Sequence, residues 1–386
     1  MRFSKNIASL VPSATLAISA RAKQMRAAGE SVIDLSAGEP SFPTPDVGIA
    51  AGVAFVRSGK AGYPPTPGIP KLRAAVADYI NGSTEHASLE PANVIISAGV
   101  KQALFNLSFC LFQEGDEVLV PTPHWPTYLA VVQLAGALPV IVPTAWDDGF
   151  RIDIDELERL RSPATKALFL NSPGNPSGSV YDRDLMEQLA AWARENDVWI
   201  VSDEIYRRLY YQGDSAPSIY DVPHAADRVV HLDGVSKAFS MPGWRIGYAA
   251  APTELIQKMS ALQSQTTSGA AGPSQHTAAA VLASPERDDI VRGFRDVLHR
   301  RRDTAVAALR DVPGLEVREP AGAIYLYVRL TGSENSLEVA EELLVEAGVA
   351  SVPGEPFGTP GYLRLNYSVS DDELAEGLAR IKTFFS

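Results

Sequence analysis

The sequence predicts an α/β protein with a large, mostly parallel α/β/α sandwich domain and a smaller α+β domain. Three observations support this prediction. Short β-type runs alternate with helical patterns up to about residue 285. A different order of helices and strands follows that residue. The length of 386 residues fits two domains, one of them large.

The first region contains seven β-type runs and at least four helical patterns between them. Strands are predicted at 93–97, 117–120, 140–142, 167–170, 199–201, 229–232 and 246–249. Helices are predicted at 101–112, 127–134, 154–160 and 184–196. Strands that alternate with helices in this way build βαβ units, so we expect a mostly parallel sheet.

The second region begins with a long charged helix, expected at 286–310. Strands at 314–318, 323–329 and 362–367, a helix at 336–347 and a final helix predict a sheet of two or three strands. We therefore divide the chain into an N-terminal arm with part of the small domain (1–45), a large domain (46–285) and a small C-terminal domain (286–386). The Pro/Gly-rich segment 62–70 is predicted to be a rigid, extended loop.

Composition excludes several classes of function. A hydrophobic content of 46% and a charged content of 21% are typical of a folded protein. The net charge of −12 argues against a nucleic-acid or anionic-membrane partner. The single cysteine, Cys110, cannot form an intramolecular disulfide or a cysteine metal site, which is compatible with a reducing compartment. No metal site is predicted.

No segment is predicted to cross a membrane. The longest apolar stretch, from Tyr128 to Pro143, is interrupted by Gln133, Gly136 and Pro139. The first residues combine positive charges with small side chains, as secretion signals do, but Pro12 and scattered Ser and Thr leave no clean apolar segment. We therefore expect a cytoplasmic protein.

Lys237 lies in a loop of small residues between two predicted strands. A single lysine is most often a surface charge. Here, however, Ser236 precedes it and Arg245 follows, and a hydroxyl with a guanidinium is a suitable pair of partners for a phosphate. A partly desolvated lysine near other cations loses its proton more readily and becomes a nucleophilic amine.

Other candidate residues follow the ends of predicted strands. Asp203 comes directly after Trp199–Val201, where ligands bind in an open α/β sheet, although it could equally cap a helix. Asn175 lies in a turn-rich segment whose amides could donate to an anion. Gly99 precedes a helix whose first N–H groups, at Val100 and Lys101, favour an anion. Trp125 is a core residue or a stacking platform.

Taken together, these motifs resemble the class I aminotransferases of fold type I, which depend on pyridoxal phosphate (PLP). The resemblance is closest to bacterial aspartate aminotransferases and aspartate/prephenate aminotransferases and covers almost the whole chain. The matching blocks are DLSAGEPSF from Asp34, YPPTPGIPKLR from Tyr63, AGVKQALFN from Ala98, NSPGNPSG from Asn171, SDEIY from Ser202, SKAFSMPGWRIGY from Ser236 and YLRLNYS from Tyr362.

The resemblance implies how the chain holds PLP, with 46–285 as the PLP-binding domain. Lys237 would carry the cofactor as a Schiff base and later shuttle a proton, and Asp203 would pair with the ring nitrogen. Tyr206 and Asn175 would hydrogen-bond the ring oxygen, and Trp125 would stack on the ring. The remaining cofactor-binding residues would be Gly99, Val100, Lys101, Ser236, Arg245 and, from the neighbouring subunit of a homodimer with shared active sites, Tyr63.

The resemblance also implies the substrates, an amino acid and a 2-oxo acid. Arg364 would hold the α-carboxylate of the amino acid, helped by Asn175, Trp125 and the backbone of Gly38. Thr15 and Lys101 match positions that contact the distal carboxylate of dicarboxylic substrates, which favours L-aspartate or L-glutamate with 2-oxoglutarate or oxaloacetate.

Three positions depart from the usual pattern: His124 replaces a tyrosine, Gly174 an asparagine and Pro242 a threonine. His124 borders Trp125 and therefore bears on side-chain specificity. Three alternatives stay open. The enzyme could act on prephenate or aromatic amino acids. It could be a PLP β-lyase or synthase on the same fold. It could also be a non-catalytic regulator, although the acidic charge and the filled catalytic positions disfavour that role.

Overall fold

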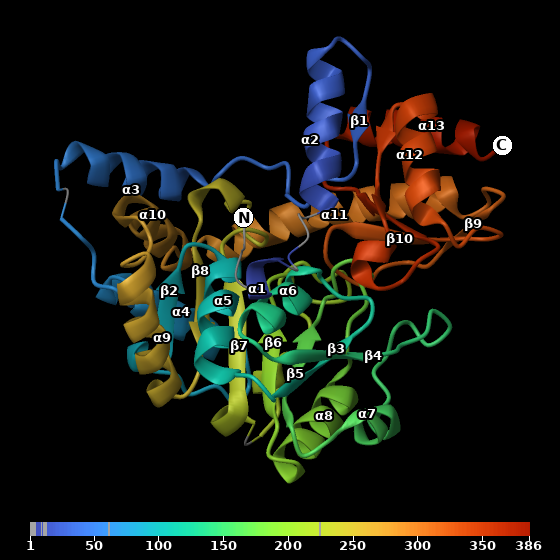
Figure 1. The fold of residues 1–386 in the computed structure, drawn as a ribbon. Helices are drawn as coiled ribbons and strands as arrows, with labels where there is room; N and C mark the ends of the chain where they lie inside the picture. The colour runs from blue at the N-terminus through green and yellow to red at the C-terminus, as the bar shows by residue number, and fades with distance from the viewer. Residues whose placement is uncertain (1–4, 9, 11–13, 61, 224) are drawn as a thin grey trace.

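The computed structural model describes residues 5–8, 10, 14–60, 62–223 and 225–386 (Figure 1). A seven-stranded sheet forms the centre of the larger part of the molecule, in the order β2-β8-β7-β6-β5-β3-β4. Its strands are β2 (Val94–Ser97), β3 (Glu117–Pro121), β4 (Leu138–Val142), β5 (Thr165–Asn171), β6 (Trp199–Asp203), β7 (Val229–Gly234) and β8 (Gly247–Ala250). All seven predicted strands are confirmed.

The sheet is mostly parallel, because β8 alone runs against its two neighbours, β2 and β7. The other pairs are parallel: β7 with β6, β6 with β5, β5 with β3 and β3 with β4. Successive strand residues belong to two different hydrophobic clusters, such as Ala167 and Phe169 on one side and Leu168 and Leu170 on the other. Both faces of the sheet are therefore covered.

Helices cover the two faces. Buried residues of α5 (Val100–Leu111), α6 (Thr127–Leu134) and α9 (Thr253–Thr266) belong to one cluster. Those of α4 (Pro70–Asn81), α7 (Ile154–Leu160), α8 (Arg183–Glu195) and α10 (Gly272–Leu282) belong to the other. The helices predicted at 101–112, 127–134, 154–160 and 184–196 are confirmed, and so is the α/β/α sandwich.

A second sheet has four antiparallel strands in the order β12-β13-β10-β9. The expectation of two or three strands was wrong, because β12 (Val352–Pro353) has only two residues and gives no alternating pattern. The other strands are β9 (Leu315–Val317), β10 (Tyr325–Leu330) and β13 (Tyr362–Asn366). The neighbouring helices are α11 (Arg287–Leu309), α12 (Ser336–Ala347) and α13 (Asp371–Phe384).

The N-terminal region joins the C-terminal part of the chain. Strand β1 (Ile33–Asp34) pairs in parallel with β11 (Val349–Ala350). The helices α1 (Lys5–Ala8), α2 (Ala14–Ala27) and α3 (Asp46–Arg57) were not predicted, and neither were α4, α9 and α10. Helix α3 packs along α10 at one end of the molecule (Figure 1). The boundaries at residues 45 and 285 stay a prediction.

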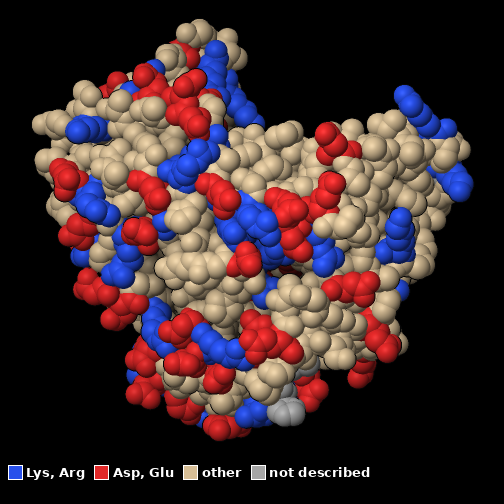
Figure 2. Space-filling view, turned by 180° about the vertical axis from the view of Figure 1, so that it is seen from behind, with Lys and Arg blue, Asp and Glu red and all other residues tan. Residues whose placement is uncertain are grey.

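The surface mixes charges of both signs. On the face shown in Figure 2, blue and red side chains are interspersed. Ion pairs such as Arg183–Glu85 at 2.5 Å and Arg295–Asp214 at 3.1 Å contribute to this mixture. In the part of the chain that the structure describes, no helix combines the length and the apolar character needed to span a bilayer.

Candidate active site

The carboxyl ends of five strands lie at one edge of the large sheet. Strands β2, β3, β5, β6 and β7 run in the same direction, so the residues that follow them meet at this edge. Strands β10 and β13 of the small sheet add Tyr325 and Arg364, and helix α2 adds Ser19 and Lys23. The site is therefore built from segments that are far apart in the sequence.

These segments enclose a cavity of about 390 Å³. It is lined by Ser19, Lys23, Ala37, Gly38, Glu39, Val100, Lys101, Trp125, Tyr128, Asn171, Asn175, Asp203, Ile205, Tyr206, Ser236, Lys237, Pro242, Arg245, Tyr325 and Arg364. Eleven of these residues belong to the predicted site: Gly38, Val100, Lys101, Trp125, Asn175, Asp203, Tyr206, Ser236, Lys237, Arg245 and Arg364. The structure thus brings most of the predicted residues together.

Lys237 is half-buried in the loop after β7. Its Nζ donates a hydrogen bond to the carbonyl oxygen of Gly38 and lies 5.6 Å from the centre of the Tyr206 ring. Burial lowers the pKa of Lys237 below its ordinary value, and the nearby charge of Arg364 lowers it further. The amine is therefore more readily neutral than a surface lysine, as a nucleophile or base requires.

Asp203 is a buried carboxylate at the end of β6. The hydroxyl of Tyr128 donates to its Oδ2 at 2.7 Å, and the backbone N–H of Ile205 donates to Oδ1 at 3.3 Å. Burial raises the pKa of Asp203 to about 6, against the opposing effect of the Tyr128 hydrogen bond. A cationic ring group in the cavity would favour the ionised form.

The hydroxyls of Tyr206 and Tyr325 are hydrogen-bonded at 2.8 Å, with either oxygen as the donor. Burial raises the pKa of Tyr206 well above its ordinary value, so the hydroxyl stays protonated at neutral pH. Tyr206 comes from the segment after β6 and Tyr325 from β10. This contact joins the two sheets at the cavity.

Arg364 is a buried cation that faces the cavity from β13. Its Nη1 donates to Asn175 Oδ1 at 2.9 Å, and its Nη2 donates to the Ser36 carbonyl at 2.8 Å. The guanidinium also lies 4.3 Å from the centre of the Tyr325 ring. Its Nε has no hydrogen-bond partner among the described residues. A buried donor without a partner is unusual. Because Arg364 lines the cavity, its guanidinium is suited to bind a carboxylate there.

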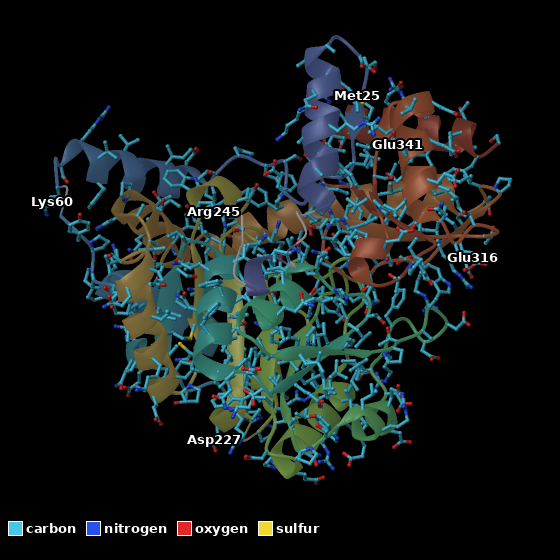
Figure 3. All side chains as sticks on the ribbon, in the orientation of Figure 1. Met25, Lys60, Asp227, Arg245, Glu316 and Glu341 are labelled. Carbon is cyan, nitrogen blue, oxygen red and sulfur yellow. The ribbon has the colours of Figure 1, made fainter. Side chains whose placement is uncertain are left out.

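The N-terminus of α5 forms another side of the site. Gly99 caps this helix with φ +84° and ψ 162°, a conformation that glycine adopts far more readily than other residues. A Cβ atom at this position would collide with the guanidinium of Arg245. The first backbone N–H groups of α5 have no partner within the helix, and together with Arg245 and Ser236 they form an anion-binding arrangement. Arg245 is labelled at the upper edge of the large sheet in Figure 3.

Lys101 and Trp125 line the cavity together. The Nζ of Lys101 lies 5.0 Å from the centre of the Trp125 indole, and Lys101 is exposed at the mouth of the cavity. The indole packs edge-on against Tyr128, with the ring centres 5.6 Å apart. Trp125 is thus a half-buried platform with a cation beside it.

Tyr63 is a predicted residue that does not line this cavity, and the side chain of Thr15 cannot be placed. Tyr63 is 96% exposed, in the extended loop before α4. Thr15 lies near the start of α2, but its side chain is outside the described part of the chain. Gly99 borders the site through the contact of its backbone with Arg245. The assignment of individual roles to all these positions stays a prediction.

Several lining residues were missed by the sequence analysis. Tyr128 follows Trp125 by three positions at the start of a helix, a spacing that places both on one side and could have revealed it. Asn171, the other asparagine of the turn-rich segment considered for anion binding, was left out of the predicted site; it ends β5, and its Nδ2 donates to the Asp203 carbonyl at 2.9 Å. Tyr325, Ser19 and Lys23 reach the cavity only through the tertiary fold.

The three unusual positions lie at or beside the cavity. Pro242 lines it, whereas His124 and Gly174 line a smaller hollow behind Tyr128. His124 is buried, and burial lowers its pKa to about 4, so its ring is neutral. Its backbone N–H donates to the Phe357 carbonyl at 3.0 Å, and the imidazole packs against Gly358.

The chain is similar to known proteins over its full length. The profile of the family "Aminotransferase class I and II" matches residues 30–381. A probable aspartate/prephenate aminotransferase of Aquifex aeolicus is 38% identical, covering 97% of this chain and 96% of the relative. The aspartate aminotransferase of Geobacillus stearothermophilus is 39% identical, covering 100% and 99%.

Solved structures give the same result. The aspartate aminotransferase of Thermus thermophilus with maleate matches with a TM-score of 0.95 and 38% identity, covering 99% of this chain and 100% of the other. The aspartate aminotransferase of Thermotoga maritima matches with a TM-score of 0.93 and 36% identity, covering 99% of both. The chain therefore belongs to the class I and II aminotransferase family.

Proposed function

We propose that this enzyme transfers the amino group between L-aspartate or L-glutamate and a 2-oxo acid, 2-oxoglutarate or oxaloacetate. The observation that carries this proposal is the arrangement of three groups in one cavity. The amine of Lys237, the buried carboxylate of Asp203 and the guanidinium of Arg364 all belong to residues that line it. Transamination needs a base, an anion for the cofactor ring and a cation for the substrate carboxylate.

The family depends on PLP, and the cavity fits this cofactor. The N-terminus of α5 with Ser236 and Arg245 would hold its phosphate, Asp203 its ring nitrogen, and Trp125 the face of its ring. Lys237 would bind its aldehyde carbon covalently. When bound, PLP supplies an electron-withdrawing ring that stabilises negative charge at the substrate's α-carbon.

The protein's own residues would position the substrate and move its proton. Arg364 would fix the α-carboxylate through its guanidinium, while its bonds to Asn175 and Ser36 hold that group in place. Once the substrate's amino group had replaced Lys237 on the cofactor carbon, the freed, neutral Nζ of Lys237 would accept the proton from the α-carbon. Correct alignment of the reacting groups contributes, at best, roughly 7–11 kcal/mol to lowering the barrier.

A dicarboxylic substrate is supported by the second cation at the cavity. Lys101 lies beside Trp125, away from the contacts of Arg364, and could neutralise a distal carboxylate. Lys23 adds a further positive charge from α2. The relatives named aspartate aminotransferase support the same substrate class.

Prephenate is the second candidate substrate. Relatives from Aquifex aeolicus and Thermus thermophilus are named aspartate/prephenate aminotransferases, the first of them as probable. A cavity of about 390 Å³ that stays open at Lys101 has room for a bulkier dicarboxylate. We rank prephenate second because aspartate is in the names of all these relatives, whereas prephenate is in the names of only some of them.

We further infer a cytoplasmic homodimer with shared active sites. The exposed Tyr63 supports the dimer, because its ring makes little contact with its own chain. The neighbouring helix α3 also exposes Ile49, Val53 and Val56, an apolar row suited to contact with a second subunit. The acidic composition and the single, unpaired Cys110 support a cytoplasmic location.

The test is a half-reaction screen. The absorbance of the bound cofactor is followed as amino acids are added one at a time. These are L-aspartate, L-glutamate, phenylalanine, alanine and the amino acid that forms when prephenate accepts an amino group. We expect conversion to the amino form of the cofactor with the two dicarboxylic amino acids first, and none in Lys237→Ala. Release of ammonia and pyruvate from a substrate with a β-leaving group, without amino transfer, would instead identify a β-lyase.

A further inference from the structure

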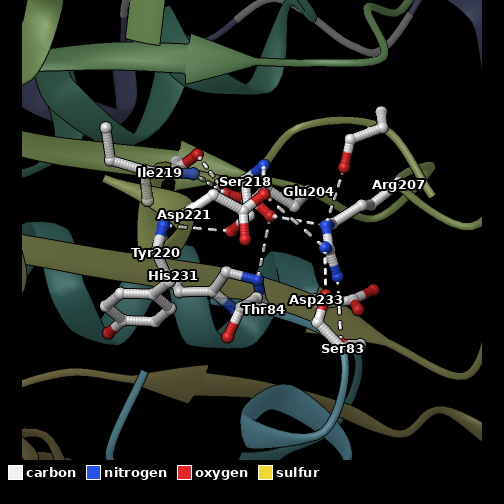
Figure 4. A network of polar contacts seen from close by, with 12 residues as sticks. Ser83, Thr84, Glu204, Arg207, Ser218, Ile219, Tyr220, Asp221, His231 and Asp233 are labelled. Carbon is white, nitrogen blue, oxygen red and sulfur yellow. Dashed lines mark hydrogen bonds and ion pairs between the residues drawn. The ribbon is translucent and has the colours of Figure 1, made fainter. Parts of the chain in front are cut away.

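A buried cluster of charged side chains surrounds Glu204 and His231 (Figure 4). Asp203, the last residue of β6, lines the cavity, and Glu204 follows it. The Glu204 carboxylate accepts from the hydroxyl of Ser202, which alternates with Asp203 along β6 and so points to the other side of the sheet. The register of β6 and β7 pairs Ser202 with His231. Glu204 and His231 therefore meet directly beneath the residue proposed to hold the cofactor ring.

Glu204 is fully buried. Its Oε1 accepts hydrogen bonds from the Ser202 hydroxyl at 2.9 Å and from the Ile219 N–H at 3.1 Å. Its Oε2 lies 3.3 Å from His231 Nε2 and 3.7 Å from Arg207 Nε. A buried carboxylate with these contacts needs a cation close to it.

His231 is the ionisable group closest to Glu204 Oε2, and Arg207 is the next at 3.7 Å. Arg207 also has other partners, since its Nε donates to the Ala216 carbonyl and its Nη1 to the Ser83 hydroxyl, both at 3.0 Å. The imidazole of His231 is 2% exposed and stacks on Tyr220, with ring centres 5.5 Å apart. Figure 4 shows the ring between Tyr220 and Glu204. The ionisable ring of His231 is therefore buried and is not among the residues that line the cavity.

We propose that His231 is a positioning residue for the active site, whose positive charge offsets that of Glu204 and so keeps the adjacent Asp203 ionised. This inference rests on the proposed function, in which the carboxylate of Asp203 pairs with the cofactor ring. Without the charge of His231, the negative charge of Glu204 would act on Asp203 through a buried region that contains little water.

The titration behaviour of the cluster agrees with this geometry. Burial raises the pKa of Asp203 to about 6, and within the cluster His231 lowers it while Glu204 raises it. Burial opposes the ionisation of Glu204, yet the charges of His231 and Arg207 hold its pKa at about 2. Burial also disfavours the charged imidazole, but Glu204 raises the pKa of His231 above its ordinary value. The charged and aromatic groups around His231 are Glu204, Arg207, Asp233 and Tyr220. Tyr248 belongs to the same surroundings because its hydroxyl donates to Asp233.

The test compares His231→Gln, Glu204→Gln and the double variant. The dissociation constant of PLP is measured for each protein from pH 5 to pH 8, with unfolding curves as a check on the fold. His231→Gln leaves Glu204 charged, so Asp203 should take up its proton at higher pH. We expect the midpoint of the acid-side loss of affinity to rise by about one pH unit, which for a midpoint near pH 6 is about fivefold weaker binding at that pH.

The double variant should restore the profile of the wild type, because removal of Glu204 removes the charge that His231 offsets. Glu204→Gln alone should not raise the midpoint. Equal midpoints in His231→Gln and the wild type, or a double variant shifted further than His231→Gln, would overturn the proposal. His299→Gln, a partly exposed histidine on α11, is the matched control and should leave the midpoint unchanged.

A variant that does not fold and a failure of the proposed function can each be distinguished from a failure of this inference. If His231→Gln does not fold, Glu204→Gln and the double variant are compared, and a higher midpoint in the double variant overturns the role of the His231–Glu204 pair. If the wild-type protein itself does not bind PLP, the proposed function fails before this inference is tested.

Discussion

The hydroxyl of Tyr128 donates to Asp203 from the first turn of α6, three residues after Trp125. The short segment 125–128 therefore supplies both the indole proposed to stack on the cofactor ring and the hydrogen bond to the carboxylate. Burial raises the pKa of Tyr128 well above its ordinary value, so this hydroxyl remains a donor throughout the working pH range. At the scale of residues, the site depends on such individual contacts.

Tyr128→Phe removes this hydrogen bond without changing the shape of the ring. The bond favours the charged form of Asp203, so its loss should raise the pKa of Asp203. The acid limb of kcat/KM should then move up by about one pH unit, because a hydrogen bond to a charged group contributes roughly 1.5–3 kcal/mol. The measurement is the pH profile of aspartate transamination. An unchanged acid limb would show that Tyr128 only fills space.

Lys101→Ala removes the cation expected to contact the distal carboxylate of the substrate. We expect kcat/KM for L-aspartate to fall about 10- to 100-fold, and that for alanine to change less than about threefold, as for loss of one charged hydrogen bond. Lys23→Ala is the matched comparison, since Lys23 lines the same cavity. Equal losses for both substrates in Lys101→Ala would remove its role in specificity.

Helix α5 connects local backbone geometry with the binding of an anion. It begins directly after Gly99, beside the guanidinium of Arg245, whose own backbone is left-handed with φ +54° and ψ 52°. Both residues adopt unusual conformations at the point where the helix N-terminus faces the cavity. Helix α5 can present its first N–H groups to an anion because Gly99, which precedes it, has no Cβ and allows the Arg245 guanidinium to lie very close to the backbone.

Gly99→Ala should weaken both the fold and the binding of PLP. The new Cβ needs an unfavourable backbone conformation and displaces Arg245, so we expect a stability loss of about 1–3 kcal/mol and at least about tenfold weaker binding. Urea unfolding and cofactor titration measure the two effects. Gly59→Ala is the control: φ is also positive at +68°, but nothing lies within 4 Å of the added Cβ. It should lose some stability and keep its affinity for the cofactor.

At the scale of the whole molecule, two sheets that are distant in sequence build one cavity. Hydrogen bonds between buried side chains are among the contacts that join them, such as Tyr206 with Tyr325 and Asn175 with Arg364. One predicted residue, Tyr63, points away from this cavity in its own chain. A second copy of the chain would explain its exposure.

A mixture of two impaired variants, assayed at a PLP concentration that leaves Tyr63→Ala largely unoccupied, tests the shared site. Lys237→Ala lacks the catalytic amine, and Tyr63→Ala should bind PLP at least about tenfold less tightly, as for loss of a charged hydrogen bond. In a dimer with one copy of each variant, one of the two sites would have both residues intact. The activity of each such mixed dimer should therefore recover towards half of that of a wild-type dimer. Sedimentation of each protein checks that dimers form. No recovery after verified subunit exchange would contradict a shared site.

The sequence by itself determined the order of the elements in the large sheet and most of the predicted site. Buried strands such as Val229–Gly234 and amphipathic helices such as Arg183–Glu195 have strong local patterns. Motifs at strand ends, such as Ser202–Tyr206, lie where an α/β sheet binds ligands. These features are local, so they can be recognised without knowing what packs against them.

Only the tertiary structure decided the rest. It revealed the two-residue strands β1, β11 and β12, which are too short to show a period, and helix α2, whose apolar residues follow no helical stripe. It placed Tyr128 against Asp203 and His231 against Glu204, across 75 and 27 positions of the chain. Such pairs depend on strand order and register, and these are set by the packing of the whole molecule rather than by any one segment.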